Sequence, residues 1–273
     1  MRLLAPKATT RFVRYRGRLA LFHNVARHED YWRDYWTDAK RNALLNNGSQ
    51  GEFGEFESVF SKHLPKAGRI LEAGCGAGHL VAALKARGYS AFGVDYELEV
   101  VDFLNREYPD LAIHAGNILK LDLPAKSLNG YVSLGVVEHF EEGPDPALRE
   151  ARRVLQDGGV ALISVPHLNP LRQRYLGRLQ DSSISQGLFF HQFYYGPKEF
   201  SSLLMKEGFR VVELFPYAVE AFLTREHPLV ARFWRSSFSR ERLRCFGRAW
   251  IASFRGALAM RYSHMLMYVC TAM

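Results

Sequence analysis

The sequence predicts an α/β protein built around a doubly wound sheet, mostly parallel, with an antiparallel last strand. Three observations support this prediction. Short apolar runs alternate with stretches of helical spacing, the connections between them are short, and a glycine-rich loop follows the first apolar run. Parallel strands joined by right-handed crossovers then place helices on both faces of one sheet.

Strands and helices are predicted in alternation from residue 69 onward. A glycine just past the last turn, as at Gly88, fits a left-handed helix cap, and Pro109 and Pro166 end the elements before them. A seventh, fully buried strand is expected at 264–270, well after the sixth. The first six strands are predicted at 69–73, 91–95, 111–115, 130–135, 160–165 and 209–215, and the helices at 79–87, 98–107, 146–155 and 197–207.

The chain is predicted to divide into an N-terminal helical arm or lid, residues 1–54, and a main unit, residues 55–273. The aromatic run at 31–36 suits one face of a helix that packs on the main unit or roofs a ligand site. The glycine- and asparagine-rich stretch 46–56 is interpreted as a loop. Residues 217–261 are predicted to form a basic helical insertion before the last strand, because no single helix of ordinary length fills that gap.

Composition indicates a globular protein without a transmembrane helix. The 273 residues are 48% hydrophobic, and no apolar run approaches the roughly eighteen residues that a spanning helix needs. Cys75, Cys245 and Cys270 are too few and too scattered for a disulfide framework or a zinc site, which favours a reducing, cytoplasmic location. The arginine-rich first 28 residues contain no acid and fit a basic surface arm better than a mitochondrial presequence.

The net charge of +8 is concentrated near the C-terminus. Residues 225–261 contain nine arginines and two acids, a local balance of 9 − 2 = +7, and aromatic side chains lie among them. A helical cap over the substrate site, with solvated arginines, is the favoured interpretation. Peripheral contact with an anionic membrane and a grip on RNA phosphates are the alternatives, and nucleic acid is the least favoured.

The stretch "RILEAGCGAGHL" carries three glycines at alternate positions, Gly74, Gly76 and Gly78. The dinucleotide fingerprint would need its third glycine where the chain has His79, and no Gly-Lys-Ser/Thr of a phosphate loop follows. Asp95 stands 21 positions after Gly74, where an acid can accept hydrogen bonds from a ribose diol or cap the next helix. The pattern favours a nucleoside cofactor bound against bare backbone.

These stretches closely resemble the class I S-adenosylmethionine-dependent methyltransferases, of the small-molecule type. The family's acid-x-Gly-x-Gly-x-Gly loop is matched by Glu72 and the three glycines, and its acid at the end of strand two by Asp95. "HAGNILKLDLPAKSLNGYVSLGVVEHF", "ARRVLQDGGVALISVPHLN" and "HQFYYGPKEFSSLLMKEGFRVVELF" are similar to its later motifs. The resemblance spans roughly residues 55–216. It implies a Rossmann-like fold, S-adenosylmethionine as cofactor, and methyl transfer.

The resemblance also implies which residues contact the cofactor. Asn117 stands where the family usually has an aspartate facing the adenine amino group, and its amide oxygen can still accept from that amine. Ile118 would supply a backbone amide to the adenine ring, and Tyr96 a face for the ring to pack against. The implied cofactor-binding residues are Glu72, Gly74, Cys75, Gly76, Gly78, Asp95, Tyr96, Asn117, Ile118 and Gly135.

Methyl transfer from a sulfonium mainly requires alignment of the acceptor, and an oxygen acceptor must also lose its proton. A histidine suits that task because its pKa lies near neutrality. His139 and His167 follow the fourth and fifth predicted strands at the carboxyl edge of the sheet, where open α/β sheets bind ligands. Both are candidate bases, and a structural or cofactor-contact role is the alternative for His139. His191 is assigned to a lid over the acceptor site or to core packing.

The predicted function is S-adenosylmethionine-dependent methylation of a small molecule, at an oxygen of a metabolite, a sugar or a quinone-like compound. The basic segment suits an anionic or lipophilic acceptor. An RNA or protein methyltransferase is one alternative, although the Asn/Asp-Pro-Pro-Tyr motif of base amino methylation is absent from the sequence. A non-catalytic subunit of the same fold is the other. No His, Asp and Cys pattern has metal-ligand spacing, so no metal is predicted, and oligomeric state is left open.

Overall fold

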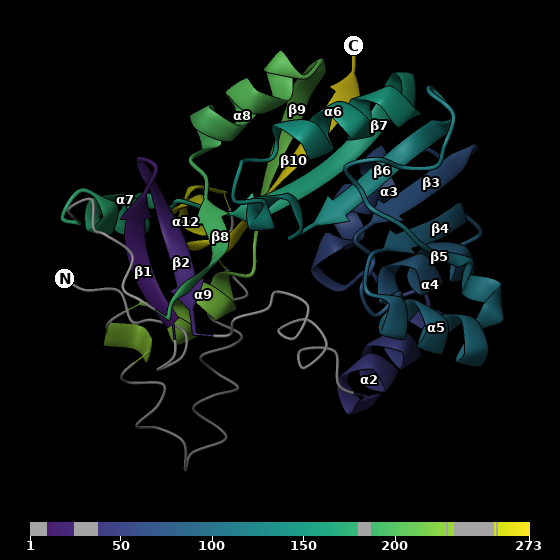
Figure 1. The fold of residues 1–273 in the computed structure, drawn as a ribbon, viewed down its shortest axis with the longest axis horizontal. Coiled ribbons are helices and arrows are strands. Elements are labelled where there is room, and N and C mark those ends of the chain that lie inside the picture. The colour runs from purple at the N-terminus through teal and green to yellow at the C-terminus, as the bar shows by residue number, and fades with distance from the viewer. Residues whose placement is uncertain (1–9, 25–37, 180–186, 228, 232–253, 255) are drawn as a thin grey trace.

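The computed structural model describes residues 10–24, 38–179, 187–227, 229–231, 254 and 256–273. Within them the chain forms two sheets, one of seven strands and one of three, with helices around both (Figure 1). The aromatic helix predicted at 31–36 and most of the arginine-rich segment 225–261 lie outside the described residues. The interpretations that rest on those two segments therefore stay predictions.

The seven-stranded sheet confirms the predicted fold class. Its order is β5-β4-β3-β6-β7-β10-β9; the strands from β5 to β7 pair in parallel, and β10 runs antiparallel to both of its neighbours. The chain leaves β3 toward β4 and β5 and then returns to β6 on the other side of β3. This reversal opens a crevice at the carboxyl ends of β3 and β6, the usual place for a ligand. The strands are β3 (Arg69–Ala73), β4 (Ser90–Asp95), β5 (Ile113–Ala115), β6 (Leu128–Leu134), β7 (Leu155–Pro166), β9 (Phe209–Tyr217) and β10 (Met265–Ala272).

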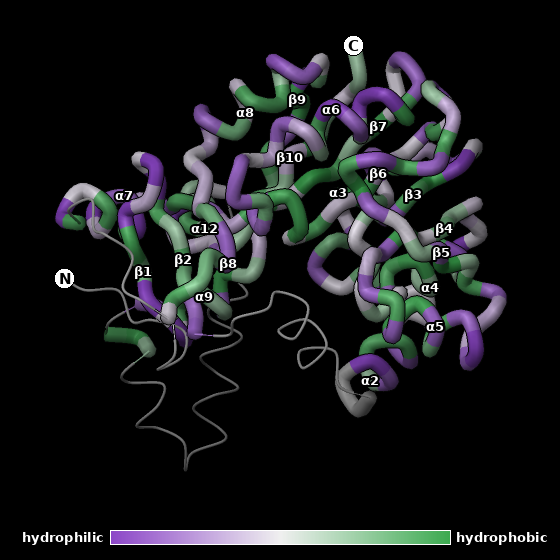
Figure 2. The backbone as a smooth tube through the Cα atoms, in the orientation of Figure 1, coloured by the Kyte–Doolittle hydropathy of each residue, from purple (hydrophilic) through white to green (hydrophobic). Residues whose placement is uncertain are grey.

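Helices cover both faces of this sheet because successive strand residues point to opposite sides. Ile70 and Val132 pack in one layer with α3 and α4, whereas Leu71 and Tyr131 pack in the other with α6 and α8. The helices α2 and α5 pack with α4 in the first layer. Figure 2 shows hydrophobic segments mainly along the strands and hydrophilic ones along the outer turns. The helices are α2 (Asp38–Ser49), α3 (Glu57–His63), α4 (His79–Ala86), α5 (Leu98–Glu107), α6 (Asp145–Val154) and α8 (Pro197–Lys206), with short 3-10 turns η1 (Gly54–Phe56), η2 (Pro109–Leu111) and η3 (Val137–His139).

Helix α2 continues to Ser49, so the loop predicted at 46–56 begins later than expected. The reason lies at Gly48, where an added Cβ would stand 2.3 Å from the carbonyl oxygen of His79 at the start of α4. Gly48 therefore acts as a close-packing residue between two helices, although glycine in a sequence more often signals a turn. This contact places α2 beside the glycine-rich loop.

The prediction of a helical arm is wrong for residues 10–23, which form a β-hairpin. The strands β1 (Thr10–Tyr15) and β2 (Arg18–His23) pair antiparallel, and β2 pairs with β8 (Phe189–Tyr194) to complete the three-stranded sheet. The hairpin turn consists of Arg16 and Gly17, at φ 51° and 76°. Two consecutive residues in the left-handed region form the tight turn that matches the twist of paired strands. Arg-Gly is a weaker sequence signal for this turn than Asn-Gly.

The three-stranded sheet packs on both of its faces. Val13, Ala20 and Phe22 join the core of the large sheet, whereas Phe12 and Leu21 pack against a helical layer. The tip of the hairpin is also tied to the loop after η3, because the Tyr15 hydroxyl donates to the Glu141 carboxylate over 2.7 Å. The helical layer consists of α7 (Pro170–Leu176), α9 (Val219–Arg225) and α12 (Gly256–Tyr262).

A buried ion pair joins α7 to the residues that follow α9. Arg172 is fully buried, donates to the Glu226 carboxylate through both Nε and Nη2, and donates through Nη1 to the carbonyl oxygens of His167 and His264. Burial alone would raise the pKa of Glu226, but the Arg172 guanidinium and His264 outweigh it and lower that pKa to about 2. The pair therefore holds the start of the predicted insertion 217–261 against the end of β7 and the start of β10.

Candidate active site

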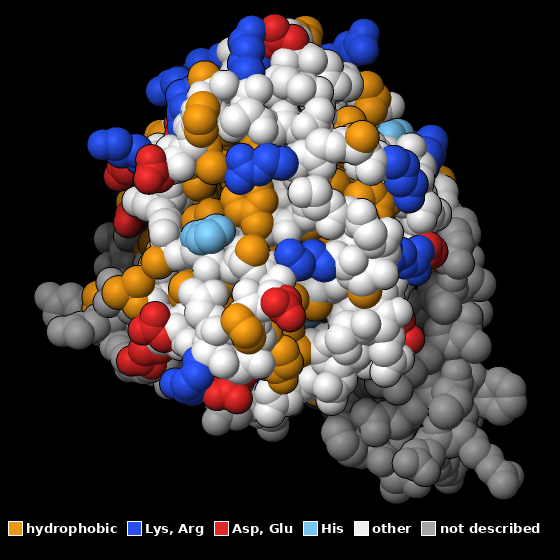
Figure 3. All heavy atoms as spheres, turned by 90° about the vertical axis from the view of Figure 1, so that its right-hand side faces the viewer, with side chains coloured by type: hydrophobic (Ala, Val, Ile, Leu, Met, Phe, Trp, Pro, Cys, Tyr) orange, Lys and Arg blue, Asp and Glu red, His pale blue; other side chains and the backbone are white. Residues whose placement is uncertain are grey.

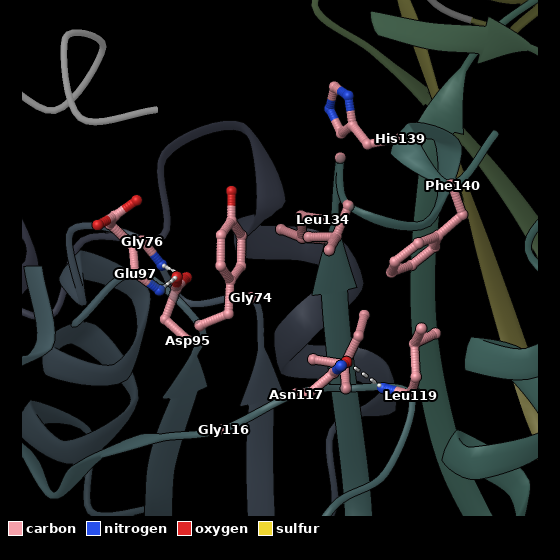
Figure 4. Close-up of a pocket in the computed structure, with 14 residues that line it drawn as sticks. Gly74, Gly76, Asp95, Glu97, Gly116, Asn117, Leu119, Leu134, His139 and Phe140 are labelled. Carbon is pink, nitrogen blue, oxygen red and sulfur yellow. Dashed lines mark hydrogen bonds between the residues drawn. The ribbon is translucent and has the colours of Figure 1, made fainter. Parts of the chain in front are cut away.

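A cavity of about 410 Å³ lies at the carboxyl ends of β3, β4 and β6 (Figure 4). It forms where the chain reverses direction across the sheet, as the topology requires. The predicted site residues that line the cavity are Gly74, Gly76, Asp95, Tyr96, Asn117, Ile118, Gly135 and His139. The remaining lining residues, which the sequence did not indicate, are Glu97, Gly116, Leu119, Leu134, Val136 and Phe140.

The glycine-rich loop forms the floor of the cavity with bare backbone. Gly74 has φ 77°, and a Cβ added there would stand 2.6 Å from a methyl carbon of Val136. The Gly74 and Cys75 amides both donate to the carbonyl oxygen of Val94, over 2.8 and 3.1 Å. These bonds fix the loop against the end of β4, so a ligand can contact the Gly74 and Gly76 backbone directly.

Asp95 is held in place by the same loop. Its Oδ2 accepts from the Gly76 amide over 2.7 Å and its Oδ1 from the Glu97 amide over 3.0 Å (Figure 4). Burial raises the pKa of Asp95 above its ordinary value, and the Glu97 and Gly76 amides oppose part of that shift. A carboxylate oxygen can accept more than one hydrogen bond, so both oxygens retain capacity for hydroxyl donors.

On the next loop, Asn117 differs in one respect from the sequence prediction. Its Oδ1 already accepts from the Leu119 amide over 2.9 Å, which leaves one lone pair for an outside amine (Figure 4). Tyr96, with 47% of its surface exposed, also lines the cavity and offers a flat apolar ring for a second ring to stack on.

A second cavity, of about 400 Å³, lies between the glycine-rich loop, α2 and η1. Glu72, Cys75 and His79 line it, and it shares Gly74 and Leu134 with the first cavity. Glu72 is buried and accepts from the Val81 amide over 3.1 Å; burial raises its pKa well above the ordinary value. A long ligand can therefore extend from one cavity to the other across Gly74.

Two predicted cofactor residues, Gly78 and Cys75, do not line the first cavity. Gly78 lines neither cavity; it starts α4 at φ 70°, with Leu104 packed where a Cβ would point. Cys75 is 2% exposed, and burial raises the pKa of its thiol well above the ordinary value. The thiol is therefore protonated and unreactive at neutral pH.

His139 lies in η3, on the opposite side of the cavity from Asp95 (Figure 4). Its Nδ1 is 2.6 Å from the carbonyl oxygen of His191, a bond in which the ring nitrogen must be the donor. The ring centroids of His139 and His191 are 4.8 Å apart, and those of His191 and His23 are 5.0 Å apart. His23 gave no signal in the sequence, because only the pairing of β2 with β8 brings it to this place.

Residues 71–163 match the methyltransferase domain family, and this range contains the glycine-rich loop, Asp95, Asn117 and η3. Proteins named probable S-adenosylmethionine-dependent methyltransferases are similar to the chain. Residues 71–163 therefore form a domain of the S-adenosylmethionine-dependent methyltransferase type. The methyl donor of such domains is S-adenosylmethionine, a nucleoside with a ribose diol and an adenine ring.

The similarity to known methyltransferases is partial in sequence. The relative from Mycolicibacterium smegmatis is 34% identical, over 40% of this chain and 47% of the relative. The relative from Mycobacterium tuberculosis is 29% identical, over 58% of this chain and 55% of the relative. The chain thus spans about half the length of the curated relatives it matches. Two solved methyltransferases share the fold. The one from Methanosarcina mazei has a TM-score of 0.54 at 14% identity, over 79% of this chain and 97% of its own. The one from Mesorhizobium loti has a TM-score of 0.52 at 15% identity, over 81% of this chain and 99% of its own.

His167, predicted as a second candidate base, does not line the cavity. It is 2% exposed, and its Nδ1 is 2.7 Å from the Ser263 hydroxyl. Burial, with the nearby charge of Arg172, lowers its pKa to about 3, so the ring is neutral at physiological pH. The sequence placed it correctly at the carboxyl end of β7, but its side chain packs toward α12 and the buried ion pair.

Among the residues that the structure describes, no group of three or more His, Cys, Asp or Glu side chains is arranged to hold a metal ion. No helix among the described residues is long and apolar enough to cross a membrane. Figure 3 views the molecule from the side of α4 and α5, where basic and acidic side chains are interspersed. That face therefore presents no extended field of one charge.

Proposed function

We propose that the chain transfers a methyl group from S-adenosylmethionine to a hydroxyl oxygen of a small molecule. The observation that carries this proposal is a single cavity with Asp95 and the glycine-rich loop at one end and His139 at the other. The first end has the donors and acceptors that a nucleoside requires. The second end has an imidazole beside apolar side chains, where an acceptor can be aligned away from water.

The residues present fit the cofactor. Asp95 would accept from the ribose hydroxyls, and Asn117 with Ile118 would face the adenine ring. The aminoacyl end would extend across Gly74 toward Glu72 in the second cavity, which is close enough to share lining residues. When bound, the cofactor supplies an electrophilic methyl group on a sulfonium. The chain itself orients the nucleoside, excludes water and positions the acceptor.

The covered position of His139 favours a small acceptor over a polymer. Strand β8 bonds to η3 through the His191 carbonyl, and the hairpin is tied to Glu141 just beyond. The three-stranded sheet therefore covers the His139 end, whereas a protein or nucleic-acid chain would need an open approach. The cavity size is in the range of small-molecule sites.

The test is thermal unfolding with S-adenosylhomocysteine, the demethylated cofactor, for the wild type and for Asp95→Ala. We expect the wild type to gain about 2.7 kcal/mol at 100 times the dissociation constant, since a ligand that binds only the native state stabilises it by mass action. Asp95→Ala should lose most of that gain, because the ribose loses its acceptor and Gly76 its amide partner. The shift in Tm measures both.

Asp102→Ala, an exposed acid on α5, is the matched control and should keep the full shift. NAD serves as the control ligand, because it shares the adenosine of S-adenosylhomocysteine but not the homocysteine end. Equal stabilisation by NAD, or an unchanged shift in Asp95→Ala, would contradict the assigned cofactor site.

A further inference from the structure

Glu138 is a buried carboxyl that the fold does not satisfy. It lies in η3 with 2% of its surface exposed, and its Oε2 has no hydrogen-bond partner among the described residues. The other buried glutamates differ: Glu72 accepts from the Val81 amide and Glu226 pairs with Arg172. A buried polar atom without a partner destabilises the folded state, so stability does not explain why Glu138 is here.

The Glu138 carboxyl lies directly behind the cavity lining. A Cβ on Gly135, which lines the cavity, would stand 3.5 Å from Glu138 Oε1. The buried hydroxyl of Tyr195 also has no hydrogen-bond partner among the described residues, and it lies near enough for the Glu138 charge to act on it. Two buried polar groups without a hydrogen-bond partner among the described residues therefore lie within electrostatic range of each other.

The spacing between Glu138 and His139 fits one hydroxyl group. His139 Nδ1 donates to the His191 carbonyl, so the lone pair of the ring is on Nε2, and Nε2 is 3.9 Å from Glu138 Oε1. That gap is too long for a direct hydrogen bond. A hydroxyl oxygen about 2.8 Å from each atom can bridge it.

We infer that Glu138 is the base that takes the acceptor's hydroxyl proton, while His139 Nε2 holds the same hydroxyl in line with the methyl group. The inference rests on the proposed function. The acceptor oxygen forms its bond to the methyl carbon as the methyl–sulfur bond breaks, and the bonding pair stays on sulfur to give a neutral thioether. The hydroxyl proton passes to the Glu138 carboxylate.

The environment of Glu138 sets the pH range in which it can act. Burial raises its pKa to about 8, which its own backbone amide opposes only in part. The Glu138 charge also acts on the phenols of Tyr194, Tyr195 and Tyr217, whose pKa values burial raises, so they stay neutral there. Among the described residues His139 also faces Glu138, with its Nε2 3.9 Å from Glu138 Oε1, and the His191 ring lies behind it. The base form of Glu138 therefore increases as pH rises through about 8.

The experiment compares Glu138→Gln with Glu142→Gln, an exposed acid four positions along the chain. Methyl transfer from tritiated S-adenosylmethionine to a panel of phenols, alcohols and sugars is measured from pH 6 to 9. We expect Glu138→Gln to lower kcat by about 100-fold or more, the usual contribution of a general base. The kcat of the wild type and of Glu142→Gln should rise as pH increases through 8, whereas the kcat of Glu138→Gln should not.

Thermal unfolding separates a catalytic role from a structural one. The folded state binds the Glu138 proton more tightly than the unfolded state. Glu138 therefore lowers the free energy of unfolding of the wild type increasingly as pH rises toward 8. Glu138→Gln should therefore equal or exceed the wild-type Tm at pH 6 and exceed it further at pH 9. Its S-adenosylhomocysteine shift should be unchanged.

A Tm of Glu138→Gln below that of the wild type would show that Glu138 has a structural role. A methyl-transfer rate and pH profile equal to those of the wild type would show that Glu138 takes no part in the reaction. Either result overturns the inference. Transfer by the wild type to none of the hydroxyl compounds overturns it as well. If the wild type also shows no S-adenosylhomocysteine shift, the proposed function fails with it. If that shift is present, only the role of Glu138 falls.

Discussion

Replacing Arg172 with Met is expected to lower the free energy of unfolding by about 3–5 kcal/mol, the cost of removing one partner of a buried ion pair. The loss leaves the Glu226 carboxylate without its guanidinium in a site that is 1% exposed, and it also leaves the His167 and His264 carbonyls without their shared donor. Urea unfolding of the two proteins, followed by circular dichroism, measures the difference. The loss should separate α7 from the residues after α9.

Arg174→Met is the matched control, because Arg174 lies on the same helix and is exposed. It should change stability by no more than about 0.5 kcal/mol. The double variant Arg172→Met/Glu226→Leu should recover much of the loss, since no charge is then left buried alone. An equal loss in Arg172→Met and Arg174→Met would show that the buried pair contributes nothing.

The same pair predicts the acid sensitivity of the fold. The pKa of Glu226 is lowered to about 2 in the folded state, so its stabilisation is present above the unfolded value near 4.5 and is lost as pH falls between these values. The wild type should lose stability over this range more steeply than the double variant. Equal dependence of the free energy of unfolding on pH in the two proteins would contradict the pairing of Glu226 with Arg172.

Replacing Gly74 with Ala is expected to destabilise the protein by about 2–4 kcal/mol, from the cost of a left-handed backbone and from overpacking. At φ 77° the new Cβ is strained, and it also stands 2.6 Å from a methyl carbon of Val136. Because Gly74 lines both cavities, the S-adenosylhomocysteine shift in Tm should disappear. Urea unfolding and the ligand shift are measured on the same protein.

Gly88→Ala provides the control for backbone strain. Gly88 has φ 81°, but nothing lies within 4 Å of the position its Cβ would occupy. It should show the strain alone, about 1–2 kcal/mol, and keep the full ligand shift. The difference between the two variants then measures the contact between the glycine-rich loop and Val136, and a retained shift in Gly74→Ala would place the cofactor elsewhere.

The large sheet was predictable because its signals are local. Apolar runs, the glycine cap at Gly88 and the breaks at Pro109 and Pro166 lie next to the elements they end, and these elements follow the predicted order. The hairpin at 10–23 was missed because its strands are stabilised by residues 189–194, which no local pattern in the N-terminal segment can show. Gly48 was misread for the same reason, since its partner is the His79 carbonyl.

In the candidate site, too, the residues marked by a local motif could be predicted, and those that depend on distant contacts could not. Residues in the glycine-rich loop and at strand ends were found because their backbone positions follow from the motif. His167 lies at the predicted strand end but does not line the cavity, because a strand end fixes where a residue lies and not which way its side chain packs. Glu138 was seen only as the neighbour of His139, and its distinguishing property, burial without a partner, exists only in the folded chain.

The three-stranded sheet also constrains the order of events during synthesis. Strand β2 ends at His23, but its partner β8 begins at Phe189. At about 5–20 residues per second, ribosomes need roughly ten seconds to half a minute to make the intervening chain. Throughout that interval the edge of β2 that will bind β8 has no partner, and such an edge is prone to pair with other chains. A circular permutation that joins the two ends of the chain and opens it just before β8 would shorten the exposure, because fewer residues then separate β8 from the hairpin.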